Sequence, residues 1–132
     1  MAKILIIDDD NDVRNYLMRL VSMFHHTPFC AATCEEGRKR MCQAEPRIDV
    51  IIADVYLPDG PDVAEQWIIE LKEKAQGRPL IVITGAASDE LVAEIESSNE
   101  IMATLTKPFE LVFIEELLKR ATENVESCSD ML

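Results

Sequence analysis

Short apolar runs alternate with longer amphipathic stretches along the whole sequence, and this alternation constrains the fold more than any other feature. Three runs are continuous and rich in Ile, Leu and Val, at residues 4–7, 50–53 and 80–83. Such runs are typical of strands that are buried on both faces of a sheet. Weaker runs at 27–32 and 101–106 complete a set of five predicted strands.

The stretches between the runs predict helices. In the first, apolar residues recur at helical spacing, at Val13, Leu17, Leu20 and Phe24. A capping box of Thr33 and Glu36 predicts the start of the second helix, which ends at about Gln43. Gly60-Pro61 predicts the third, with proline at its first helical position and an end at about Ala75.

The last two helices are predicted from a cap and from an apolar stripe. Ser88 is a candidate N-cap, followed by two acidic residues that favour a helix start, for a helix over about 88–98. An apolar stripe from Leu111 to Val125 predicts the final helix, with a frayed end from about Glu126. Strands that alternate with helices predict an α/β fold with a parallel sheet between two helical layers. We expect one domain over 1–121, with 122–132 as the end of the last helix and a tail.

In sheets of this kind, ligands bind beyond the carboxyl ends of the strands, so functional residues should end a strand or begin the next loop. Four predicted strands meet this requirement: Asp8, Asp9 and Asp10 follow the first, Asp54 the third, Thr84 the fourth and Lys107 the fifth. Each has a local explanation, such as helix capping by Asp10. Together they predict one site at the edge where the carboxyl ends meet, which we call the carboxyl edge.

The chemistry of these residues is coherent. Clustered carboxylates repel one another unless a cation lies among them, and Mg²⁺ prefers oxygen ligands and pairs with phosphate. Lys107 would supply a positive charge for a phosphoryl oxygen, and Thr84 a hydroxyl donor. Asp54 would then act as a carboxylate nucleophile that forms an aspartyl phosphate.

Composition excludes several other classes of protein. A net charge of −12 and a pI near 4.5 argue against direct binding of nucleic acid. No apolar run approaches the roughly 20 residues needed to cross a bilayer, and the start of the chain is unlike a signal peptide. The four cysteines form no metal or redox motif and predict reduced thiols in the cytoplasm. His25 and His26 are adjacent, so they would not converge on one ion, and we expect a solvated helix end there.

Four segments together resemble the signature of bacterial two-component response-regulator receiver domains of the chemotaxis type. They are 3–10 (KILIIDDD), 51–58 (IIADVYLP), 81–85 (IVITG) and 106–109 (TKPF), and the resemblance extends from residue 3 to about 121. It implies a flavodoxin-like (βα)5 three-layer sandwich with strand order 2-1-3-4-5.

The resemblance also implies a role for each matching residue. Asp54 is implied to be the phosphoacceptor, and Mg²⁺ to be held by Asp8, Asp9, Asp54 and the backbone carbonyl of Tyr56. Thr84 is implied to be the switch hydroxyl. Lys107 is implied to pair with the phosphate and to precede a cis bond to proline.

Two positions depart from the family pattern and concern the output of the domain. Thr104 stands where an aromatic residue is usual, and Asp62 where glycine is common. A small residue at position 104 predicts a muted conformational change on the face made by the fourth helix, the last strand and the last helix. That face is the implied docking surface for a downstream protein.

The implied donor is a sensor histidine kinase or a histidine phosphotransfer protein, and a homodimer is possible. The chain would not be an enzyme beyond Mg²⁺-dependent self-phosphorylation and autodephosphorylation at Asp54. Because it begins at Met1 and ends in a polar tail, we interpret it as a receiver-only protein. The alternative is a receiver cut from a longer regulator with a DNA-binding or enzymatic output.

Two other classes share parts of the pattern. A haloacid-dehalogenase-like phosphatase also has an Asp-x-Asp motif after its first strand, but that motif continues with Thr or Val where this chain has Asp12. A flavodoxin-like cofactor carrier would need a hydroxyl- and glycine-rich loop after the first strand. Three aspartates at that position would repel the phosphate of a cofactor.

Overall fold

The computed structural model describes residues 2–61, 64–85, 93, 95, 99–106 and 111–130. Five strands form one parallel sheet in the order β2-β1-β3-β4-β5, which confirms the predicted fold class and strand order. The strands are β1 (Lys3–Ile7), β2 (Thr27–Ala31), β3 (Val50–Asp54), β4 (Leu80–Thr84) and β5 (Ile101–Thr106).

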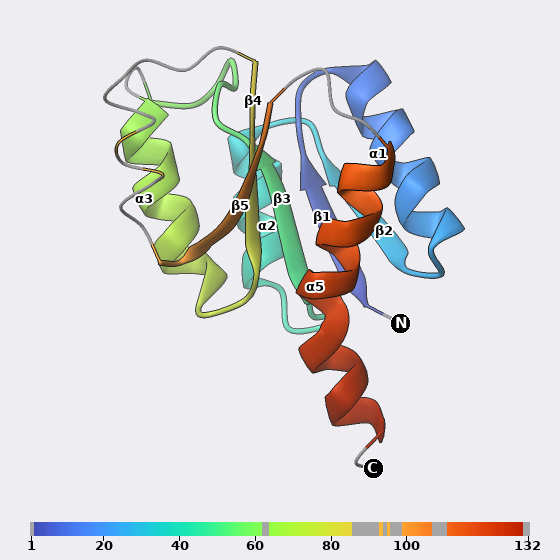
Figure 1. Ribbon diagram of the computed structural model, residues 1–132. Helices are drawn as coiled ribbons and strands as arrows, with labels where there is room; N and C mark the ends of the chain where they lie inside the picture. Colours follow the sequence, from blue (N-terminus) through green and yellow to red (C-terminus); the bar gives the residue numbers. More distant parts are fainter. Residues whose placement is uncertain are drawn as a thin grey trace.

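Helices cover both faces of this sheet, which gives the three layers that the alternation predicts. In Figure 1, α1 and α5 lie on one face, and α2 and α3 lie on the other. The helices are α1 (Asn11–Met23), α2 (Cys34–Cys42), α3 (Ala64–Ala75) and α5 (Leu111–Asp130).

Alternate residues of the central strands enter two separate cores. The core under α2 and α3 takes one set of strand residues, Leu5, Ile7, Ile51, Ala53, Leu80 and Val82. The core under α1 and α5 takes the other set, Ile4, Ile6, Val50, Ile52, Ile81 and Ile83. Burial of each large side chain stabilises the fold by roughly 1.5–3 kcal/mol, so the sheet is a firm support for the residues at its edges.

Two helix starts form as the sequence predicts. The carboxylate of Asp10 accepts hydrogen bonds from two N–H groups in the first turn of α1. Thr33 Oγ1 accepts from the N–H of Glu36 at 3.1 Å. The carboxylate of Glu36 accepts from the N–H of Ala32 at 2.8 Å, so the capping box reaches one residue further back than in the usual motif.

The start of the third helix and the end of the last differ from the predictions. The described part of α3 begins at Ala64, and Pro61 is not helical, so its expected place at the first helical position is wrong. The chain is still leaving a turn there, which the Gly60 N–H closes on the carbonyl of Leu57 at 3.0 Å. Helix α5 continues to Asp130, beyond the frayed end expected from about Glu126, because no Gly or Pro interrupts it.

Some predictions fall on other parts of the chain. Of the helix expected at about 88–98, only residues 93 and 95 are described, and both are helical. Asp62, Lys107 and Pro108, with the expected cis bond, lie outside the described residues. Of the helices that the structure describes, none has both the length and the apolar composition needed to cross a bilayer.

Three of the cysteines, Cys30, Cys34 and Cys42, are free thiols. His25 is exposed with a φ of 68° just after α1, and His26 Nδ1 accepts a hydrogen bond from the N–H of Ala2 at 3.1 Å. The pair therefore ends a helix and secures the start of the chain.

Candidate functional site

The parallel sheet brings three of the predicted site residues to the carboxyl edge. Asp8 directly follows β1, while Asp54 and Thr84 are the last residues of β3 and β4. Asp54 is in register with Ile83, one residue before Thr84, so the two strand ends lie side by side. The predicted positions of these three residues at strand ends are confirmed.

Three carboxylates gather at this edge. Ligand oxygens of Asp8, Asp9 and Asp54 all lie within 4.8 Å of one another. Asp8 is 0% exposed and Asp54 is 4% exposed, while Asp9 faces solvent. Ionised carboxylates at this spacing repel one another, and the repulsion is strongest where water is excluded. The cluster is therefore buried on one side and open to solvent on the other.

The backbone holds two of these carboxylates in place. Asp8 Oδ1 accepts a hydrogen bond from the N–H of Asp10 at 2.9 Å, and Asp54 Oδ1 accepts from the N–H of Tyr56 at 3.0 Å. An all-oxygen set of carboxylates, partly open to water, is the kind of site that a small hard cation such as Mg²⁺ prefers. The residues present fit that ion. The Tyr56 carbonyl, as a further ligand, stays a prediction.

Thr84 contributes a buried hydroxyl at the same edge. Thr84 is 5% exposed, and its Oγ1 makes no hydrogen bond within the part of the chain that the structure describes. Burial of a hydroxyl without a partner is unfavourable, so a bound group that accepts its proton would be favoured. Thr104, on the neighbouring strand β5, is exposed.

Three residues at the site or on the loop that follows β3 were not anticipated from the sequence. Arg14 Nη1 donates to the carbonyl of Asp8 at 2.6 Å. The indole Nε1 of Trp67, in α3, donates to the carbonyl of Asp54 at 3.1 Å. Asp59 accepts hydrogen bonds from the start of α2. Each of these contacts involves a backbone group, which leaves no signature in the pattern of residue types.

The contact from Trp67 completes the hydrogen bonding at the end of β3. The pairing of β1 with β3 ends at Ile7 and Ala53, one residue before Asp54. The indole N–H then meets the carbonyl of Asp54, and the Trp67 ring is 1% exposed. A buried carbonyl without a partner is costly, so Trp67 stabilises the position at which the strand ends.

Comparisons with known proteins agree with this arrangement. The family model described as the response regulator receiver domain matches residues 4–121. Response regulator MprA of Mycolicibacterium vanbaalenii is 33% identical over 123 residues, which are 90% of this chain and 48% of that protein. Protein Rrf1 of Nitratidesulfovibrio vulgaris is 31% identical over 124 residues, which are 91% of this chain and 82% of that protein.

Solved structures show the same fold. The signal receiver domain of an HD domain-containing protein from Pseudomonas fluorescens superposes with a TM-score of 0.80 at 21% identity. That match covers 96% of this chain and 98% of the other. The chain spans about half the length of the MprA proteins that it matches, at 48% of their sequence.

Proposed function

The chain belongs to the response regulator receiver family of two-component signalling, and on that premise we propose that Asp54 accepts a phosphoryl group. The observation that carries the proposal is the approach of Asp8, Asp9 and Asp54 to within 4.8 Å of one another. Asp54 ends a central strand, where Trp67 and the Tyr56 N–H hold its backbone and its carboxylate. A nucleophile held in this way needs little reorganisation before it reacts.

The donor is the phosphohistidine of a sensor histidine kinase or of a histidine phosphotransfer protein. A carboxylate oxygen of Asp54 attacks phosphorus, the bond from phosphorus to the imidazole nitrogen breaks, and that nitrogen keeps the electron pair. The product is an aspartyl phosphate. Positioning and charge neutralisation are most of what a protein contributes to phosphoryl transfer.

Asp8, Asp9 and Asp54 would hold Mg²⁺, together with the backbone carbonyl of Tyr56. When bound, the ion supplies the positive charge that offsets the carboxylates and the phosphoryl oxygens. Asp8 is fixed from both sides, by the N–H of Asp10 and by Arg14. Asp54 would gain and lose a phosphoryl group, and the chain would turn over no other substrate.

Thr84 would carry the conformational response. Its buried hydroxyl makes no hydrogen bond within the described residues, so a phosphoryl oxygen would give it an acceptor. Lys107 would pair with the same phosphate. A bound group shifts a conformational equilibrium only by its differential affinity for the two states, and we assign much of that difference to Thr84. Thr84→Ala should therefore uncouple phosphorylation from the response, while Thr104→Ala leaves it nearly intact.

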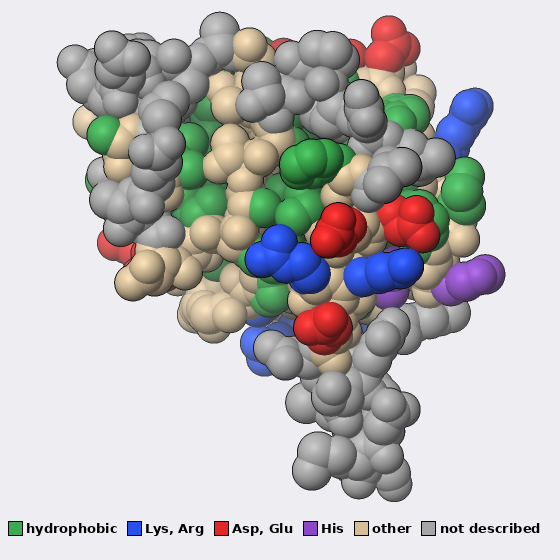
Figure 2. Space-filling view, in the orientation of Figure 1, with side chains coloured by type: hydrophobic (Ala, Val, Ile, Leu, Met, Phe, Trp, Pro, Cys, Tyr) green, Lys and Arg blue, Asp and Glu red, His purple; other side chains and the backbone are tan. Residues whose placement is uncertain are grey.

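The downstream partner would dock on the fourth helix, β5 and α5. Phe113 of α5 is 61% exposed, which offers an apolar anchor on that face. Figure 2 shows acidic and basic side chains side by side on one face of the molecule. On α5, Glu115 and Lys119 form an ion pair at 3.5 Å. Mixed charge of this kind suits a protein partner, or a second copy of the chain, better than a nucleic acid.

The direct test of the acceptor is incubation with acetyl phosphate and Mg²⁺, followed by intact-mass spectrometry. The wild type should gain the mass of one phosphoryl group and Asp54→Asn none, because an amide is not a nucleophile. Asp12→Asn, which changes an exposed carboxylate in α1, is the matched control and should be labelled like the wild type. Full labelling of Asp54→Asn would assign the acceptor to another residue.

A further inference from the structure

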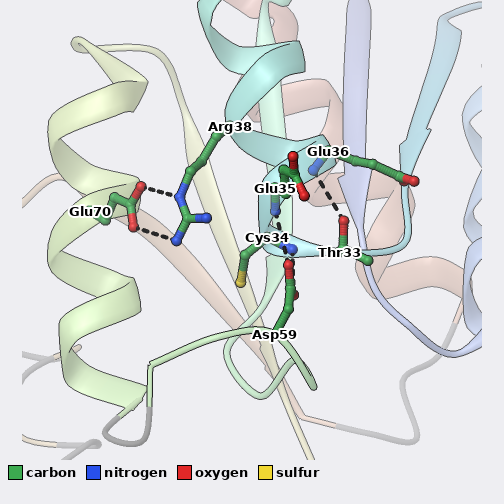
Figure 3. A network of polar contacts seen from close by, with 7 residues as sticks. All are labelled: Thr33, Cys34, Glu35, Glu36, Arg38, Asp59 and Glu70. Atoms are coloured by element: carbon green, nitrogen blue, oxygen red, sulfur yellow. Dashed lines mark hydrogen bonds and ion pairs between the residues drawn. The ribbon is translucent and has the colours of Figure 1, made fainter.

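The turn that follows β3 is anchored to the start of α2 by one side chain. Asp59 Oδ1 accepts a hydrogen bond from the N–H of Cys34 at 2.8 Å, and Oδ2 accepts from the N–H of Glu35 at 3.1 Å. Figure 3 shows the carboxylate pointing at the first turn of the helix. These N–H groups have no acceptor inside the helix, so they bind an external carboxylate well.

Helix α2 already has a local cap and does not need Asp59 to begin. Thr33 Oγ1 accepts from the N–H of Glu36 at 3.1 Å, three residues away in the chain. Asp59 reaches α2 from 25 residues further along the sequence. A contact between segments this far apart restricts the loop that carries Asp59 more than it restricts the helix.

That loop is fixed at Tyr56 and at the turn that contains Asp59. At one end, the N–H of Tyr56 donates to Asp54 Oδ1 at 3.0 Å. At the other end, the N–H of Gly60 donates to the carbonyl of Leu57 at 3.0 Å, which closes a turn that contains Asp59. The backbone of Tyr56 therefore lies between the carboxylate of Asp54 and the anchor at Asp59.

The helix that receives the anchor is itself held firmly. Arg38 of α2 binds Glu70 of α3 through two contacts, Nε to Oε2 at 2.5 Å and Nη2 to Oε1 at 3.1 Å (Figure 3). The Arg38 guanidinium lies 5.4 Å from the centre of the Trp67 ring, whose indole N–H holds the carbonyl of Asp54. Both ends of the loop are thus tied to the same pair of packed helices.

We propose that Asp59 is a positioning residue for the cation site. By anchoring the turn to α2, it holds the backbone of Tyr56 where its carbonyl can complete the ligands supplied by Asp8, Asp9 and Asp54. The proposal rests on the function proposed above, since it concerns the affinity of the same site for Mg²⁺. Asp59 acts through the backbone and touches neither the ion nor the phosphoryl group.

The test is a Mg²⁺ titration followed by amide NMR on the wild type and three variants. Asp59→Ala should weaken Mg²⁺ binding about tenfold, the lower end of the loss that follows removal of an outer-shell partner. Asp59→Asn should lie closer to the wild type, because its amide oxygen can still accept from one N–H of α2. Thr33→Val is the matched control: it removes the other cap of α2 and should leave the affinity unchanged.

Hydrogen exchange in the absence of Mg²⁺ supplies a second readout. Asp59→Ala should speed exchange of the Tyr56 and Gly60 amides, and Thr33→Val should not, because only the first variant frees the loop.

Each contrary result has a definite meaning. Equal Mg²⁺ affinity in Asp59→Ala and wild type overturns the inference and leaves the proposed function standing. If Thr33→Val weakens Mg²⁺ binding as much as Asp59→Ala does, the loss of affinity comes from a less stable α2. If Asp59→Asn weakens it as much as Asp59→Ala does, the loss comes from the missing negative charge. Either result also overturns the inference. If the wild type does not bind Mg²⁺, both the cation site and the metal-dependent part of the proposed function are contradicted.

Discussion

The amino edge and the carboxyl edge of the sheet differ in how their charged groups are neutralised. At the amino edge, where the strands begin, one cation meets several backbone acceptors. The guanidinium of Arg78 donates to four carbonyls, those of Lys74 at 2.7 Å, Ala75 at 2.8 Å, Met41 at 3.0 Å and Ile48 at 3.1 Å. Three of these carbonyls end α2 or α3, where the helix dipole favours positive charge. Burial lowers the pKa of Arg78.

At the carboxyl edge, charges of the same sign are brought together instead. Asp8, Asp9 and Asp54 lie within 4.8 Å of one another, and Thr84 keeps a buried hydroxyl without a hydrogen bond in the described part of the chain. The amino edge is completed by groups of the chain itself, whereas the carboxyl edge has the composition of a site that is completed by a ligand. This difference indicates that the amino edge contributes to stability and the carboxyl edge to function.

The largest expected effect is at the amino edge. Arg78→Met should lower the free energy of unfolding by about 3 kcal/mol, because four part-buried hydrogen bonds to carbonyls lose their charged donor. Urea denaturation followed by circular dichroism measures this. Arg78→Lys is the control that keeps the charge but lacks the planar fork of donors, and it should recover only part of the loss. If Arg78→Met lowers the free energy of unfolding no more than a substitution at an exposed site does, the amino edge does not contribute to stability in the way proposed.

A smaller loss of stability is expected at the carboxyl edge, where Trp67 donates a hydrogen bond to the end of β3. Trp67→Phe removes the indole donor to the carbonyl of Asp54 and should cost about 2 kcal/mol, since one acceptor is affected at this edge and four at the other. It should also slow phosphorylation by acetyl phosphate. Arg38→Met serves as a comparison for stability, because it removes the cation over the ring and the ion pair with Glu70 but keeps the indole N–H; it should cost less than Trp67→Phe.

Removal of the Thr84 hydroxyl should not destabilise the fold. Thr84→Val keeps the shape of the side chain and should be at least as stable as the wild type, because the hydroxyl has no hydrogen bond to lose among the described residues and its burial is unfavourable. Its response to beryllofluoride, a phosphate mimic, should nevertheless be weakened in amide spectra. A destabilisation as large as that of Arg78→Met would show that this edge, too, is built for stability.

The smallest expected effect is a pH dependence of the contact between the exposed Asp59 and the start of α2. The hydrogen bond from the Cys34 N–H, supported by that from Glu35, holds the pKa of Asp59 below its usual value. The contact therefore contributes fully above the ordinary aspartate pKa of about 3.9 and is lost as the pH falls through the lowered value. Amide shifts of Cys34 and Glu35 should follow this titration, and in Asp59→Asn the step should disappear. A midpoint at or above the ordinary value would mean that the cap is not formed in solution.

The contrast also separates what the sequence could predict from what it could not. The runs of Ile, Leu and Val specify β1, β3 and β4 almost to the residue, because strands buried on both faces need continuous apolar sequence. Asp8, Asp54 and Thr84 follow from the rule that sites lie at the carboxyl ends of parallel strands.

The residues that hold these elements together could not be predicted in the same way. Arg78, Trp67 and Asp59 each bind a backbone group that is remote in the sequence. Almost every residue carries the same backbone donor and acceptor, so the sequence does not indicate which one is bound. The proline signal before α3 was misleading for a related reason. Pro61 follows the turn that the Gly60 N–H closes and that Asp59 connects to α2, and the local preference of proline carries no information on such a long-range contact.

The central claim is that the carboxyl edge is completed by a cation, and one linkage experiment tests it most directly. Urea unfolding of the wild type and of Asp9→Ala should be compared with and without Mg²⁺, at about ten times the dissociation constant of the wild type. The account predicts that Mg²⁺ raises the free energy of unfolding by roughly 1.4 kcal/mol in the wild type and by far less in Asp9→Ala. Equal increments in the two proteins would contradict the account, because the stabilisation would then not come from the carboxylate cluster.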